Sequence, residues 1–144
     1  MTFTVRPAKA SDVPAMFHIR THVRENMLSM DELAALGITP QSVAQMLDGP
    51  ACAWVAEMNG DIAGFALSDL KDACLFAIFV APEHEGAGIG RALVQQAEDT
   101  MLAHHSKIWL ETLRGSRADG FYRHLGWHEA ADAGPGDVRL EKLA

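Results

Sequence analysis

The feature that most constrains the fold of this chain is residues 75–105, where an apolar run meets a glycine-rich turn and then a helical pattern. Residues 75–80 are rich in strand-forming side chains, and Pro82 ends the run. The pattern predicts a buried strand, a tight turn and a long helix in that order. The apolar residues with helical spacing after the turn are Ile89, Leu93, Ala97 and Met101.

The turn has glycines at alternate positions, Gly86, Gly88 and Gly90. Glycines expose backbone N–H groups, and the helix that starts there adds its partial positive end, so this junction suits an anion such as a phosphate. The same glycines also fit a plain tight turn between a strand and a helix. Two common phosphate loops are excluded, because no Gly-Lys-Ser/Thr follows and because the spacing differs from the Gly-x-Gly-x-x-Gly of dinucleotide folds.

The length and composition are those of one ordinary domain, which we expect to span residues 1–144, since 49% of the residues are hydrophobic. The 12 basic and 19 acidic residues give a formal charge of −7. This charge argues against binding to nucleic acids or anionic membranes, because contacts to phosphates dominate such affinity. It favours a cationic substrate, although it also serves simply to keep a domain soluble.

The N-terminal residues contain no apolar segment typical of signal peptides, and no window approaches the length of a membrane span, so we expect a cytoplasmic protein. Cys52 and Cys74 lie in apolar, strand-like surroundings, where we expect no disulfide between them. His18 and His22 are four residues apart on a predicted helix, but no third ligand accompanies them. We therefore predict no metal site.

The remaining residues alternate between strand and helix patterns. Asn59 and Gly60 form the strongest short signal for a β-hairpin, and they join two strand-like runs. A strand, a helix and a strand in succession make a right-handed crossover, so residues 75–80 and 107–113 should be parallel neighbours. The expected fold class is α/β, with a mixed sheet of the α+β type. Strands are expected at residues 2–6, 51–57, 62–68, 75–80, 107–113, 127–130 and 138–143, and helices at residues 11–20, 39–47, 117–125 and from residue 89 onward.

Residues 80–94, VAPEHEGAGIGRALV, resemble the acetyl-coenzyme A motif of the GCN5-related N-acetyltransferase (GNAT) family, usually written Arg/Gln-x-x-Gly-x-Gly/Ala. Gly88 and Gly90 fall on the family's glycines, whereas Glu85 stands where Arg or Gln is usual. Because backbone amides do most of the binding in this motif, Glu85 weakens the match only modestly. It does place a carboxylate near the expected pyrophosphate.

A second motif, Ala118-x-x-Phe121-Tyr122-x-x-x-Gly126-Trp127, resembles the last motif of the same family, Asn-x-x-Ala-x-x-Phe-Tyr-x-x-x-Gly-Phe, with Gly115 in place of Asn. Two separated motifs in the correct order extend the resemblance over nearly the whole chain. The resemblance implies the acyl-CoA N-acyltransferase fold, in which the strands at 75–80 and 107–113 splay apart to admit the pantetheine arm.

The resemblance implies an acetyl-CoA-dependent N-acetyltransferase that uses no metal. It would transfer acetyl to a primary amine of a small molecule or peptide, by direct attack in a ternary complex. The alternative is a non-catalytic acetyl-CoA- or CoA-binding sensor or regulatory module, against which the intact Tyr122 argues. Dimers are frequent in the family, so a homodimer is an expected state, while nucleic-acid and membrane partners are not expected.

The resemblance also implies roles for particular residues. Tyr122 would protonate, or hydrogen-bond to, the departing coenzyme A thiolate, although a tyrosine half buried on an amphipathic helix is the plain alternative. The expected cofactor-binding residues are Phe79, Val80, Glu85, Gly86, Ala87, Gly88, Ile89, Gly90, Arg91, Ser116, Ala118 and Phe121.

On the acceptor side, residues 20–31 are denser in charged and amide groups than a surface helix needs. We expect Arg24, Glu25 and Asn26, with Asp69, to orient the substrate, although the segment also fits a solvated helix end. The general base would be Glu25, Glu111 or a chain of waters. Glu111 equally fits an exposed carboxylate at a sheet edge.

Overall fold

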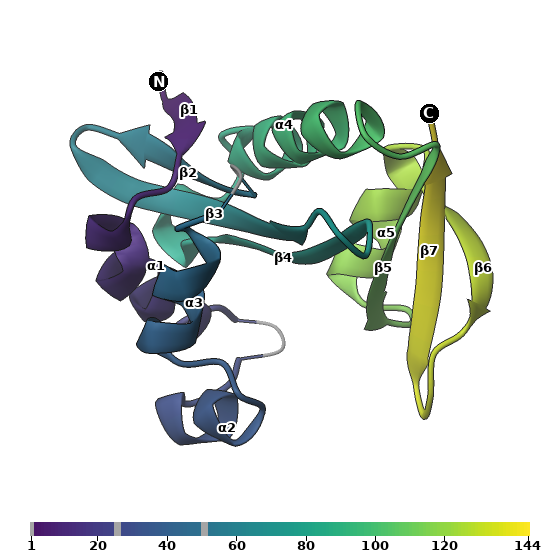
Figure 1. Ribbon diagram of the computed structural model, residues 1–144, viewed down its shortest axis with the longest axis horizontal. Helices are drawn as coiled ribbons and strands as arrows, with labels where there is room; N and C mark the ends of the chain where they lie inside the picture. The colour runs from purple at the N-terminus through teal and green to yellow at the C-terminus, as the bar shows by residue number, and fades with distance from the viewer. Residues whose placement is uncertain (1, 25–26, 50–51) are drawn as a thin grey trace.

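The computed structural model describes residues 2–24, 27–49 and 52–144, and within them a seven-stranded sheet has the order β1-β2-β3-β4-β5-β7-β6 (Figure 1). The strands are β1 Thr4–Pro7, β2 Ala53–Met58, β3 Asp61–Asp69, β4 Cys74–Val80, β5 Lys107–Leu113, β6 His128–Asp132 and β7 Asp137–Leu143. The helices are α1 Val13–Arg20, α2 Met30–Ala35, α3 Pro40–Met46, α4 Ile89–Leu102 and α5 Arg117–His124, with short 3-10 turns η1 Ala10–Asp12 and η2 Pro82–His84.

The sheet confirms the predicted fold class. β4 and β5 are parallel, and the other neighbouring strands pair antiparallel.

Helix α2 was not expected, although the sequence contains its N-terminal capping residues. The Ser29 hydroxyl accepts a hydrogen bond from the Glu32 backbone N–H, and the Glu32 carboxylate accepts one from Ser29 N–H. A second difference is that β1 extends to Pro7, which sits at the end of an edge strand, where a missing N–H is tolerated.

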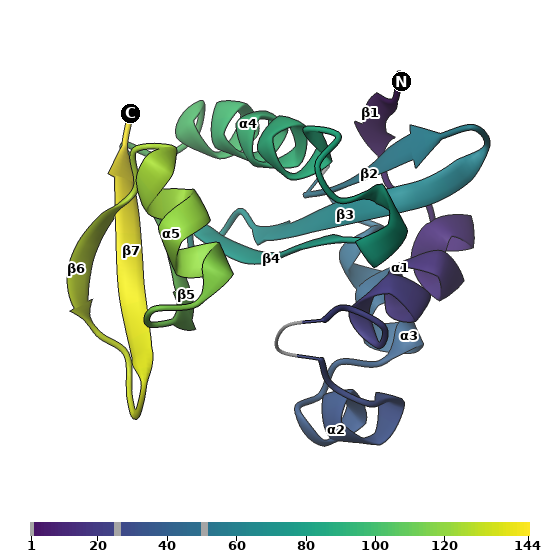
Figure 2. The ribbon, with the colours of Figure 1, turned by 180° about the vertical axis from the view of Figure 1, so that it is seen from behind.

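Helices cover both faces of the sheet. Helix α4 lies over β2, β3 and β4 on one face, and α1 and α3 lie on the other face (Figures 1 and 2). Alternate residues of β2 divide between the two layers, since Trp54 and Ala56 pack in the core beside α4 while Ala53 and Val55 pack beside α1. This is the period-two alternation of a strand that is buried on both faces.

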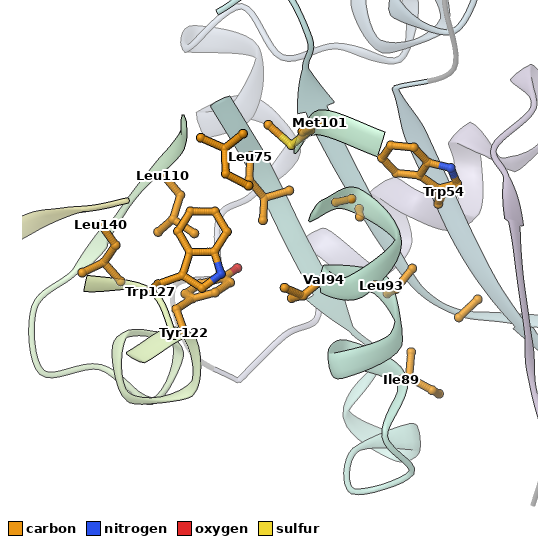
Figure 3. Close-up of a cluster of buried hydrophobic side chains, with 14 of the residues drawn as sticks. Trp54, Leu75, Ile89, Leu93, Val94, Met101, Leu110, Tyr122, Trp127 and Leu140 are labelled. Atoms are coloured by element: carbon orange, nitrogen blue, oxygen red, sulfur yellow. The ribbon is translucent and has the colours of Figure 1, made fainter. Parts of the chain in front are cut away.

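Helix α4 buries the apolar series that the sequence predicted, and Figure 3 shows Ile89, Leu93, Val94 and Met101 directed into the core. The helix can approach β3 closely because position 64 has no side chain. A Cβ atom on Gly64 would lie 3.0 Å from Ile89 Cγ2 and 3.0 Å from the Phe79 carbonyl oxygen. Gly64 thus brings the start of α4, and the turn before it, close to the sheet.

The sheet divides between β4 and β5. In the described residues these strands are bridged at one position, Cys74 opposite Trp109, and beyond it they diverge (Figures 1 and 2). Hydrogen bonds from Trp109 N to Ala73 O, 3.0 Å, and from Trp109 Nε1 to Asp72 O, 2.8 Å, reinforce the bridge. The splay implied by the family resemblance is therefore present.

Strand β4 also contains a β-bulge beside this gap. Leu67 of β3 pairs with Ala77, but the next residue, Ser68, pairs with Leu75, so Phe76 has no partner opposite it on β3. A bulge re-aims a side chain and interrupts the ladder. Phe76 is 49% exposed at this bulge.

Among the described residues, every helix is too short or too polar to span a lipid bilayer.

Candidate active site

A cleft of about 540 Å³ lies where β4 and β5 separate. Its walls come from both strands, from the glycine turn before α4, from α5 and from the end of α1 with the residues that follow it. Strand divergence creates this space, and residues from distant parts of the chain meet around it.

The glycine turn has the backbone geometry of an anion-binding loop. Gly86 and Gly88 both have φ of +83°, the left-handed region that glycine adopts without strain, and Gly88 is the N-cap of α4. No heavy atom lies within 4 Å of the position that a Cβ on either residue would occupy. The turn is therefore open toward the cleft, in front of the N-terminus of a 14-residue helix.

Glu85, at the start of this turn, interacts with two arginines from other elements. Its Oε2 atom lies 3.2 Å from Arg117 Nη1 and 3.5 Å from Arg24 Nη1. Arg117 is the first residue of α5, and Arg24 lies between α1 and α2. The negative charge at the turn thus has two cations beside it.

Helix α5 begins after a turn whose backbone conformation favours glycine. Gly115, which stands in place of the family's Asn, has φ of +80°, and its N–H donates to Asp119 Oδ2 at 2.8 Å. Burial raises the pKa of Asp119, but this Gly115 bond and the Arg123 guanidinium outweigh it, so the pKa lies below its usual value. Ser116 caps the helix by accepting from Asp119 N–H. The carboxylate of Asp119 therefore fixes the turn that positions α5.

Tyr122 lies on α5 at the inner wall of the cleft and is only 7% exposed. Figure 3 shows its ring beside Trp127, with ring centroids 5.9 Å apart in an edge-on arrangement. Burial raises the pKa of the Tyr122 phenol well above its usual value. The hydroxyl therefore stays protonated and is available as a hydrogen-bond donor.

The opposite side of the cleft is formed by apolar groups with an arginine among them. The Arg20 guanidinium lies 4.3 Å from the centre of the Phe79 ring, and burial lowers the pKa of Arg20. A smaller apolar recess of about 40 Å³ adjoins the cleft and shares Arg20, Ile38, Phe76 and Ala77 with it. Most of the other residues that line the recess belong to the core beneath α1 and α3.

Most residues predicted to bind the cofactor line this cleft. They are Phe79, Val80, Glu85, Gly86, Gly88, Ile89, Gly90, Arg91, Ser116, Ala118 and Phe121. Ala87 is not among the lining residues and packs against the core instead. The predicted catalytic residues Tyr122 and Glu111 also line the cleft.

The predicted acceptor residues are not all brought together. Arg24 lines the cleft, whereas Glu25 and Asn26 lie outside the described residues. Asp69 is not a lining residue, and its Oδ1 accepts hydrogen bonds from the backbone N–H groups of Lys71 and Asp72. These bonds close the turn between β3 and β4, which is an ordinary task for an aspartate in a turn.

Among the residues that line the cleft, Phe76, Leu113 and Arg117 were not predicted, and Arg20 was expected only as part of the segment at residues 20–31. The sequence did contain a signal for Arg117, because this residue directly follows Ser116, the N-cap of a predicted helix. Phe76 faces the cleft because of the bulge, for which the sequence carries no local signal.

His18 and His22 stack with ring centroids 4.2 Å apart, and the described residues contain no cluster of three potential metal ligands.

Comparison with known proteins agrees with this geometry. The family model described as "Acetyltransferase (GNAT) domain" matches residues 49–129, which include β2 to α5 and the glycine turn. The chain belongs to the GNAT acetyltransferase family. Members of this family are acetyl-CoA-dependent acyltransferases, so the protein is a transferase of this kind.

Among curated relatives, the [Ribosomal protein bS18]-alanine N-acetyltransferase of Escherichia coli K12 is 28% identical over 132 residues, which is 88% of this chain and 82% of the relative. The peptidyl-lysine N-acetyltransferase YiaC of the same strain is 36% identical over 76 residues, which is 52% of this chain and 49% of that protein. Both relatives are named for acetylation of amines in proteins.

Solved structures of GNAT proteins share the fold. The PaiA N-acetyltransferase of Thermoplasma acidophilum in complex with coenzyme A superposes with a TM-score of 0.80 at 15% identity, covering all of both chains. The ribosomal-protein-S18-alanine N-acetyltransferase of Escherichia coli has a TM-score of 0.74 at 20% identity, covering 99% of this chain and 94% of that one. At these identities the likeness shows the fold.

Proposed function

We propose that this protein transfers acetyl from acetyl-CoA to a primary amine by direct attack in a ternary complex. The observation that carries the proposal is the gap between β4 and β5, which begins at the Cys74–Trp109 bridge and has the glycine turn and Tyr122 on its walls. A thioester arm lying in this gap has an anion site for its phosphates and a buried phenol near its sulfur.

The gap suits the extended pantetheine arm for a backbone reason. Beyond Cys74, β4 is paired with β3 alone in the described residues, so its other edge faces the cleft. An unpaired strand edge offers amide donors and acceptors to an extended ligand, as in β-strand addition. The pantetheine amides are matching partners, and residues 85–91 then receive the pyrophosphate.

The pKa values of the two cysteines and of Tyr122 favour direct attack by the acceptor amine over a covalent acyl-enzyme. Burial raises the pKa of Cys74 to about 11, and it also raises that of Cys52, so neither side chain supplies a thiolate nucleophile at neutral pH. The raised pKa of Tyr122 makes complete proton transfer to the leaving thiolate unfavourable. We propose that Tyr122 acts by donating a hydrogen bond to that sulfur as negative charge develops on it.

The attacking amine must lose a proton, and Glu111 is a candidate base because it lines the cleft on β5. Glu25 and a chain of waters remain the alternatives. The variant Glu111→Gln separates them. A fall in turnover of about 10²-fold, with loss of the acidic limb of the pH–rate profile, assigns the base to Glu111. Unchanged turnover assigns it to Glu25 or to water.

For the acceptor we propose an amine of a peptide or protein, with the α-amine favoured over a lysine. The relative that covers 88% of this chain is named for acetylation of an alanine of a ribosomal protein. The recess beside Arg20 and Phe76 is apolar and small, which suits the first side chain of a peptide. Arg20 and Arg24 on the same side of the cleft disfavour a polycationic acceptor such as a polyamine.

The test is thiol release from acetyl-CoA in the presence of a panel of acceptors. The panel contains peptides with N-terminal Ala, Ser or Lys, α-acetylated peptides with one internal lysine, polyamines and aminoglycosides. We expect the highest kcat/KM with a small N-terminal residue. Preference for a polyamine would contradict the proposed acceptor. Coenzyme A binding without transfer to any acceptor would contradict catalysis and support the sensor alternative.

A further inference from the structure

Three charged residues from three separate elements meet at the glycine turn: Glu85 in the turn, Arg24 after α1 and Arg117 at the start of α5. We propose that Arg24 and Arg117 bind the diphosphate of coenzyme A, and that Glu85 holds their guanidinium groups at the turn until the diphosphate replaces it as their partner. This inference rests on the proposed use of acetyl-CoA.

A turn that contains Glu85 needs nearby positive charges if it is to bind a diphosphate. A carboxylate at position 85 alone would repel a diphosphate that approaches the N–H groups of Gly86 and Gly88. With two guanidinium groups within 3.5 Å of Glu85 Oε2, the three side chains together carry one net positive charge. The negative charge of Glu85 is therefore compensated within this cluster.

The exposure of the three side chains indicates which of them moves. The Arg24 and Arg117 side chains are each 72% exposed, whereas that of Glu85 is 26% exposed. An exposed ion pair contributes little free energy and breaks readily. A diphosphate is a better partner than one carboxylate, because it offers several charged oxygens and guanidinium groups bind such oxygens in pairs. We expect the arginines to change partner while Glu85 stays in place.

The two arginines also approach the turn from different sides of the cleft, one from the acceptor side and one from α5. A ligand held by both would be clamped across the mouth of the cleft. Arg24, which the sequence assigns to acceptor binding, thereby becomes a residue of the cofactor site.

The experiment measures affinity for coenzyme A and dephospho-coenzyme A by calorimetry, and kcat/KM with acetyl-CoA and with S-acetylpantetheine, which lacks the diphosphate. We expect Arg24→Ala and Arg117→Ala each to weaken binding of both coenzymes about tenfold. The fall in kcat/KM should be about tenfold larger with acetyl-CoA than with S-acetylpantetheine, because only acetyl-CoA carries the diphosphate. Arg114→Ala is the matched control, because Arg114 pairs with Glu129 and Asp132 and does not line the cleft. It should bind coenzyme A like the unchanged protein.

Glu85→Gln removes the competing carboxylate and should strengthen coenzyme A binding about threefold. Weaker binding by Glu85→Gln would overturn the assigned role of Glu85. If the arginine variants bind dephospho-coenzyme A normally, the arginines contact the 3′-phosphate and the diphosphate assignment fails. If they bind both coenzymes normally, the inference fails while the proposed function stands. Failure of the unchanged protein to bind coenzyme A would instead overturn the proposed function.

Discussion

At the scale of single residues, the variant Tyr122→Phe tests whether Tyr122 has a catalytic role or only a packing role. Tyr122→Phe keeps the ring beside Trp127 and removes the hydroxyl. Because the hydroxyl would act only as negative charge develops on sulfur, we expect kcat to fall about 10²-fold, with coenzyme A affinity and melting temperature almost unchanged. Single-turnover kinetics is the measurement, since it isolates the chemical step. Turnover within about threefold of the parent would make Tyr122 a packing residue.

A second residue-scale prediction concerns Glu98, a carboxylate on α4 that is only 4% exposed. It accepts hydrogen bonds from Trp127 Nε1 at 2.9 Å and from Lys142 Nζ at 2.8 Å. Lys142→Met would leave the buried carboxylate without its cation, and we expect a loss of about 3 kcal/mol in the free energy of unfolding. Chemical denaturation measures it. The double variant with Glu98→Gln should recover part of this loss, and no recovery would contradict the charge explanation.

At the scale of elements, the close approach of α4 to β3 depends on Gly64. Gly64→Ala places a Cβ 3.0 Å from Ile89 Cγ2 and from the Phe79 carbonyl oxygen. The backbone oxygen cannot move aside cheaply, so we expect a loss of about 1–3 kcal/mol in the free energy of unfolding.

Gly120→Ala is the control for Gly64→Ala, because Gly120 lies within α5 and no heavy atom lies within 4 Å of its Cβ position. Alanine in a helix interior should stabilise by about 0.5–1 kcal/mol. Thermal melts of the two variants should therefore shift in opposite directions. A shift in the same direction would mean that packing at Gly64 is not the cause.

Elements with strong local signals were predicted from the sequence, and those that depend on tertiary contacts were not. The Asn59–Gly60 hairpin and the crossover around α4 follow from turn chemistry and apolar spacing. Helix α2 buries only Leu33, so it has no apolar periodicity, although its capping signal was present. The bulge at Phe76 has no local signature, because register is decided by pairing with β3.

The same division holds for the site. Residues of the two motifs were predicted because they are contiguous in the sequence. Arg117 was missed because it reaches the cleft from α5, whose position is decided by packing. The ion pairs of Glu85 could not be predicted, since they join residues 61 and 32 positions apart.

At the scale of the whole molecule, we expect the free energy of unfolding to fall at low pH because of Asp12. Hydrogen bonds from the Arg6 guanidinium, at 2.8 and 3.0 Å, lower the pKa of Asp12 below its ordinary value near 3.9. The contribution is present above about pH 4 and is lost as the pH falls through the lower folded-state pKa. We expect Asp12→Asn to cost about 2 kcal/mol at pH 7 and progressively less below pH 4. A pH-independent difference in melting temperature would contradict this linkage.

The bridge between Cys74 and Trp109, where β4 and β5 meet, has a consequence for how the protein survives in a cell. Because few backbone hydrogen bonds join the two halves of the sheet at this point, we expect local opening here to expose backbone that proteases can cleave. A cofactor lying in the gap would supply the missing pairing and shift this equilibrium by about 2.7 kcal/mol at a concentration 100 times its dissociation constant. Resistance to limited proteolysis should then rise with coenzyme A concentration. The lifetime of the enzyme would thus follow the supply of its own acetyl donor.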